Sequence, residues 1–137
     1  MRLCSSAWVL ILAGLCCGCS GKSDAPQLVG VHGVILYKQK PLAGAQVLFT
    51  PDSGPFAMGE TNEKGEFLLQ TRGSSGAMIG EHRVTISAYQ PFKTDGKQTE
   101  GLPVVSRIPE KYGDLRQSNL TASVKKSDPN EFRFELQ

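Results

Sequence analysis

From residue 27 to the C-terminus, apolar and polar residues alternate in short runs that turn-forming residues interrupt. The clearest run places Val84, Ile86 and Ala88 on one side of an extended segment. Such alternation predicts half-buried strands, and breaks at Gly, Pro, Asn or Asp about every 8 to 12 residues are typical of a β-sandwich or barrel. No run in this region has the 3.6-residue periodicity of an amphipathic helix. The sequence therefore predicts one all-β domain over residues 27–137.

We expect about seven strands in an antiparallel, Ig-like β-sandwich. They are predicted at 29–37, 45–49, 57–61, 67–69, 81–88, 120–124 and 132–136. The turn at 38–41 is expected to join the first two strands in a hairpin, and the turn at 62–65 is expected to close a second hairpin, with Gly65 at positive φ. The residues expected to face one interior are Val47, Phe49, Phe67, Val84, Ile86, Phe132 and Phe134.

Residues 90–118 form a long connection without clear periodicity. Structureless connections above about 12–15 residues are uncommon in compact domains, so this segment is either functional or poorly ordered. Exposed apolar residues on a loop can mark a binding surface. The candidate binding residues here are Ile108, Pro109, Lys111 and Tyr112. Alternatively, Val104, Val105 and the apolar residues at 108 and 112 cover an open edge of the sandwich.

The N-terminus has the features of a secretory signal peptide. Arg2 precedes an uncharged stretch with an apolar centre at 7–15, and small residues follow. All four cysteines lie within the first nineteen residues. The domain itself therefore has no cysteine with which to build a disulfide framework.

The end of this segment resembles a bacterial lipoprotein signal, in which a small residue precedes the cysteine that is lipidated and becomes the new N-terminus. The resemblance implies removal of residues 1–18, a diacylated Cys19 after Gly18, and a flexible tether over 19–26. Cys16 and Cys17 stand where the family prefers a leucine and a small residue, and both remain alternative acceptors. The implied location is the cell envelope, with the protein held on a membrane by its lipid and facing the periplasm or the exterior.

Three other interpretations of the N-terminus are open. An uncleaved membrane anchor is one, because the uncharged run approaches the ~20 residues that span a bilayer. Ordinary cleavage that leaves a soluble protein is the second. A redox role for the cysteines is disfavoured, because a reactive thiol needs a folded, electropositive setting.

Three further segments carry a second resemblance: KPLAGAQV at 40–47, TNEKGEF at 61–67 and GEHRVTI at 80–86. Together they look like the carboxypeptidase regulatory-like domain, which implies a seven-stranded transthyretin-like β-sandwich. With the lipoprotein signal and IPEKY at 108–112, the chain is similar to small single-domain bacterial lipoproteins. His82 stands where that family usually has an aromatic residue.

The composition and the ends of the sequence exclude several classes of function. Fifteen Lys and Arg against thirteen Asp and Glu give a net charge of +2, and the longest basic run is Lys125-Lys126, so no nucleic-acid partner is expected. A catalytic triad or a metal site needs several side chains close together, whereas His32 should point away from the core and His82 into it. The 5-hydroxyisourate hydrolases of the transthyretin-like fold end in Tyr-Arg-Gly-Ser. This sequence has FELQ at its end instead, so that hydrolase activity is not expected.

These observations favour a non-catalytic binding or interaction module without metal or cofactor. Its expected partners are the membrane, through the lipid, and an envelope glycan or protein. The alternative is an envelope or secreted hydrolase on the same fold.

Replacing Cys19 with Ser should block lipidation, so that the precursor accumulates or is released from the membrane fraction. Mass spectrometry of the mature N-terminus should show a diacylated Cys19. Cys4→Ser is the matched control and should leave processing unchanged. An intact Met1, or a stronger defect from Cys17→Ser, would contradict the assignment.

Overall fold

The computed structural model describes residues 25–91, 104–127 and 129–137. Within these ranges the protein is all-β, as predicted, and its only helical element is the short 3-10 helix η1 (Glu110–Gly113). The predicted signal peptide, all four cysteines and most of the predicted tether lie outside the described residues.

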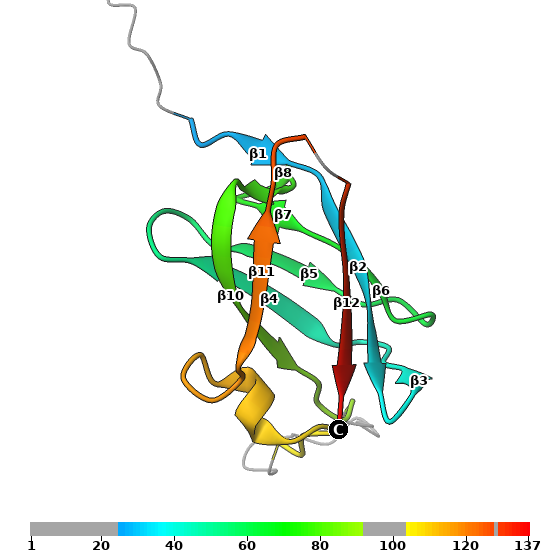
Figure 1. Ribbon diagram of the computed structural model, residues 1–137. Coiled ribbons are helices and arrows are strands. Elements are labelled where there is room, and N and C mark those ends of the chain that lie inside the picture. The colour runs from blue at the N-terminus through cyan, green and yellow to red at the C-terminus, as the bar shows by residue number, and fades with distance from the viewer. Residues whose placement is uncertain (1–24, 92–103, 128) are drawn as a thin grey trace, which may run out of the picture.

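Two facing sheets form the body of the domain (Figure 1). The strands are β1 (Leu28–Val29), β2 (Val31–Tyr37), β3 (Lys40–Pro41), β4 (Gln46–Pro51), β5 (Ala57–Glu60), β6 (Glu66–Leu68), β7 (Gln70–Thr71), β8 (Ser74–Ser75), β9 (Ala77–Met78), β10 (Gly80–Ser87), β11 (Leu120–Val124) and β12 (Asn130–Leu136). Seven of these have three or more residues and overlap the predicted ranges.

The larger sheet has the order β11-β10-β4-β5-β7-β8, and all its pairs are antiparallel. In the smaller sheet, β2 pairs with β12, β3 and β6. β12 is parallel to β2, which departs from the fully antiparallel arrangement expected from the sequence. A third pair, β1 with β9, lies at the end of the domain where the described chain begins (Figure 1).

Neither predicted hairpin joins the strands expected from the sequence. The chain does reverse after β2, but it pairs there with the two-residue β3 rather than with β4. β2 belongs to the smaller sheet and β4 to the larger one, so the segment after the turn at 38–41 carries the chain across the sandwich. The turn at 62–65 likewise leads from β5 in the larger sheet to β6 in the smaller one. Alternation identifies which residues are buried, but a sandwich buries the inner faces of both sheets, so the pattern does not say which sheet a strand joins.

The two crossings are bonded to each other through Thr61, which is buried. Its hydroxyl accepts from the backbone N–H of Ala45 at 2.8 Å and donates to the carbonyl of Leu42 at 2.6 Å. Its backbone N–H donates to the Ala45 carbonyl at 2.9 Å. A single side chain therefore satisfies backbone groups that no strand pairing reaches.

The turn after Thr61 forms as the sequence predicts. The side-chain oxygen of Asn62 accepts from the backbone N–H groups of Lys64 and Glu66 at 2.9 and 3.0 Å. Gly65 has φ +75°, and a Cβ on it would lie 2.5 Å from the Ile35 carbonyl oxygen. Only glycine fits here, because both the left-handed backbone and the close approach to β2 exclude a side chain.

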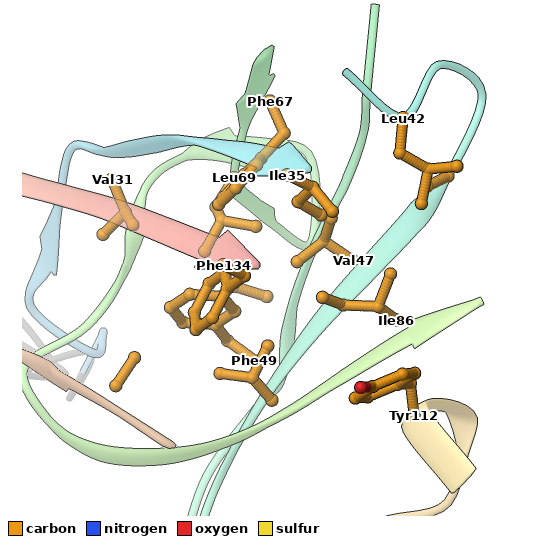
Figure 2. Packing of buried hydrophobic residues seen from close by; sticks show 14 of the residues in the cluster. Val31, Ile35, Leu42, Val47, Phe49, Phe67, Leu69, Ile86, Tyr112 and Phe134 are labelled. Carbon is orange, nitrogen blue, oxygen red and sulfur yellow. The ribbon is translucent and has the colours of Figure 1, made fainter. Parts of the chain in front are cut away.

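Phe49 lies at the centre of the core between the sheets (Figure 2). It projects from β4, and its ring centroid is 6.2 Å from that of Phe67, 5.6 Å from Phe132 and 6.1 Å from Phe134, all on the smaller sheet. The predicted interior residues are all buried except Phe132, which is half-buried against the same cluster. The predicted alternation is therefore confirmed.

Replacing Phe49 with Ala should lower the free energy of unfolding by about 3–5 kcal/mol, because the ring is fully buried and touches both sheets. Urea denaturation of the two proteins measures the loss. Lys64→Ala, in the exposed turn, is the control and should leave the midpoint unchanged. Equal midpoints for the two variants would contradict this account of the core.

Candidate functional site

The segment that follows β10 is held against the sandwich by backbone bonds. The N–H of Gln90 donates to the carbonyl of Val105 at 3.0 Å, and that of Arg107 donates to Ala88 at 2.7 Å. A guanidinium nitrogen of Arg107 also donates to the carbonyl of Ala43, in the crossing between β3 and β4. Residues 105–108 are thus fixed both to the end of β10 and to the neighbouring loop.

Two of the four candidate binding residues are part of the core. Ile108 and Tyr112 are 5% and 7% exposed and belong to the main apolar cluster. Tyr112 points from η1 toward β10 (Figure 2), and its hydroxyl accepts from the backbone N–H of Gln137 at 3.1 Å. These two side chains cover the end of the sandwich, as the alternative interpretation held. Val104 and Val105 do not cover it, because they remain 60% and 47% exposed.

The other two candidates, Pro109 and Lys111, line a surface pocket of about 380 Å³. The pocket lies between the end of β10 and the segment that contains η1. Among the described residues its lining is Ile86, Ser87, Tyr89, Ser106, Ile108, Pro109, Glu110, Lys111, Gly113, Asp114 and Gln117. We call this the η1 pocket.

Most side chains of the η1 pocket are polar. The Ser87 hydroxyl, the Tyr89 hydroxyl and the Glu110 carboxylate make no hydrogen bond to another described residue. The ammonium of Lys111 lies 4.9 Å from the ring centroid of Tyr112. The pocket therefore offers both donors and acceptors to a ligand.

Asp114 shapes the far wall of the η1 pocket. Its carboxylate accepts from the backbone N–H of Arg116 at 2.7 Å and from the side-chain amide of Gln117 at 3.3 Å. Its carbonyl accepts from the N–H of Ser118 at 2.9 Å. Four residues of the pocket were not among the binding residues predicted from the sequence: Tyr89, Glu110, Asp114 and Gln117. The turn-forming tendency of Asp was the one local signal available for any of them.

The two histidines are not brought together. His32 is exposed on the outer face of β2, opposite Glu131 and Leu68 on the neighbouring strands. His82 is 2% exposed, its Nε2 lies 2.8 Å from the Met78 carbonyl oxygen, and its ring centroid is 5.8 Å from that of Phe49. His82 therefore packs in the core beside Phe49, as alternation predicted.

A second hollow, of about 470 Å³, lies on the outer face of the smaller sheet. Its apolar floor includes Val34 and the 70%-exposed Leu68, and Glu60, Glu66 and Glu131 lie around it. The amide nitrogen of Asn62 donates to Glu66 at 3.0 Å, so part of this rim is already hydrogen-bonded.

Across the described ranges, no three His, Cys, Asp or Glu side chains gather into a set that could hold a metal ion. In the same residues no helix is long and apolar enough to cross a membrane. Comparisons with protein-family models, with curated proteins and with solved structures found no match to this chain. The family and lipoprotein resemblances therefore stay predictions from the sequence.

The double substitution Ile108→Ser with Tyr112→Ser should lower the melting temperature by several degrees, because both side chains are buried in the core. A loss of 1 kcal/mol corresponds to about 4–8 °C in a domain of this size. Thermal denaturation followed by circular dichroism measures it. Lys111→Ala is the neighbouring exposed control and should change the melting temperature little. An unchanged midpoint in the double variant would show that the segment is not part of the core.

Proposed function

We propose that this chain is a lipid-anchored cell-envelope protein that acts as a non-catalytic binding or interaction module. In this proposal the domain is a carboxypeptidase regulatory-like sandwich with the seven-stranded transthyretin-like topology, and Cys19 carries the lipid. The observation that carries the binding role is the position of the η1 pocket relative to the point where the chain enters the domain.

The described chain enters the sandwich at β1, at the same end as β8, whereas η1 and the C-terminus lie at the opposite end (Figure 1). β10 runs between these ends, and eight extended residues span about 26 Å. If a lipid on Cys19 holds the β1 end near a membrane, the η1 pocket faces away from that membrane. A pocket displayed in this way is accessible to an envelope glycan or to a neighbouring protein.

The chemistry of the lining supports binding rather than catalysis. The pocket contains hydroxyl, carboxylate, amide and ammonium groups but neither histidine. His82 is held inside the core, and His32 lies on the outer face of the other sheet. Histidine, the most frequent general acid or base, is therefore absent from the described lining, and of its two carboxylates that of Asp114 is already hydrogen-bonded to Arg116 and Gln117.

Photo-crosslinking in cells that export the full chain tests this function. With p-benzoylphenylalanine in place of Gln117, at the η1 pocket, illumination should give an adduct with a glycan or a protein of the envelope. The same probe in place of Phe56 is the control. Phe56 is also exposed, at 52%, but it borders a hollow with Arg72 and Gly73 rather than the η1 pocket. No adduct from position 117, or equal adducts from both positions, would overturn the proposal.

A further inference from the structure

We infer that the η1 pocket binds a carbohydrate, an inference that rests on the proposed binding function and names its ligand class. The η1 pocket presents a mixture of polar groups. Ser87 and Tyr89 contribute hydroxyls that both donate and accept, Glu110 contributes an acceptor and Lys111 a donor, whereas the Ser106 hydroxyl is already bonded to the Ile108 carbonyl at 2.7 Å. A sugar hydroxyl also donates and accepts at the same atom, so a lining of both kinds matches it.

A tyrosine lies at the rim of the η1 pocket. Tyr89 is two residues beyond the end of β10 and 51% exposed, and a β-bridge to Ser106 fixes its backbone. A sugar ring has an apolar C–H face that packs on an aromatic ring, while its edge carries hydroxyls. Tyr combines an apolar ring with a polar tip, and exposed rings of this kind are common where a ligand needs both contacts.

The charge of the η1 pocket also bears on its ligand. The pocket holds two carboxylates, Glu110 and Asp114, and one ammonium, Lys111. The carboxylate of Asp114 accepts from the backbone N–H of Arg116 and from the side-chain amide of Gln117, which are neutral donors and leave its charge in place. The lining therefore carries one net negative charge, which favours a neutral, polyhydroxylated ligand over an anion.

The η1 pocket has rigid walls and the size of a small-molecule site. Its floor includes Ile86 and Ile108, which belong to the main core, and its wall is the turn that Asp114 stabilises. Its volume of about 380 Å³ falls in the range of sites that bind small molecules. A site held by core packing loses little entropy when a ligand arrives.

Calorimetric titration of the full-length protein tests the inference, with chitotriose and maltotriose as separate probes and a detergent that contains no sugar. We expect at least one probe to bind with Kd below about 1 mM. Tyr89→Ala should raise that Kd at least about tenfold, whereas Tyr89→Phe, which keeps the ring, should raise it less than about threefold. Phe56→Ala removes an equally exposed aromatic ring elsewhere and should leave Kd unchanged.

Glu110→Ala provides a second variant, because this exposed side chain makes no bond that the fold needs. It should weaken sugar binding several-fold with no change in melting temperature. No heat with either sugar at 10-millimolar concentrations (about the upper limit for specific weak binding) would overturn the inference, as would binding that is insensitive to Tyr89. If position 117 crosslinks an envelope protein while neither sugar binds, the carbohydrate inference is wrong and the binding function stands. If position 117 gives no adduct, the proposed function itself is wrong.

Discussion

The ring of Phe49 joins the two sheets. It extends from β4 in the larger sheet and meets Phe67, Phe132 and Phe134 from β6 and β12 in the smaller one. With no cysteine after residue 19, the domain has no disulfide to hold the sheets together, and the described residues hold no metal cluster. The sandwich therefore depends on close packing around this ring. His82 belongs to the same cluster, where its buried ring packs against that of Phe49.

The segment around η1 serves the core and the surface together. Ile108 and Tyr112 turn inward and extend the core, while Pro109, Glu110 and Lys111 turn outward and line the η1 pocket. The same short stretch of chain thus closes the sandwich and presents polar groups. Because the inward residues fix the backbone, the outward ones are held in place without side-chain hydrogen bonds of their own.

Much of the fold could be predicted from the sequence. The period-two pattern identified the interior faces of β2, β4, β10, β11 and β12 because burial and alternation are directly linked in a strand. It also placed Gly65 in its turn. It could not distinguish a hairpin from a crossing, because the backbone of Leu42 and Ala45 in the first crossing is bonded by the side chain of Thr61 rather than by a strand pairing. The parallel pairing of β12 with β2 was equally invisible, since partner choice is a property of the assembled sheet.

The candidate site was predicted only in part. Ile108, Pro109, Lys111 and Tyr112 were found because they combine apolar and charged residues in a long connection, yet two of them are core residues. Tyr89 lies between the predicted strand at 81–88 and the long connection at 90–118, and it was assigned to neither. Its place beside η1 follows from the bridge to Ser106, which joins residues that are remote in the sequence.

The pairing of β12 with β2 places Asn130 beside Val31 and Leu136 beside Tyr37. The first long strand, which also pairs with β3 and β6, thus meets its third partner about a hundred positions later in the sequence. Contacts of such high sequence separation form late and slow folding. A chain made from its N-terminus cannot complete the smaller sheet until β12 has been synthesised. For a protein exported as proposed, this order of events delays completion of the sandwich and favours passage of the unfolded polypeptide through a translocation channel.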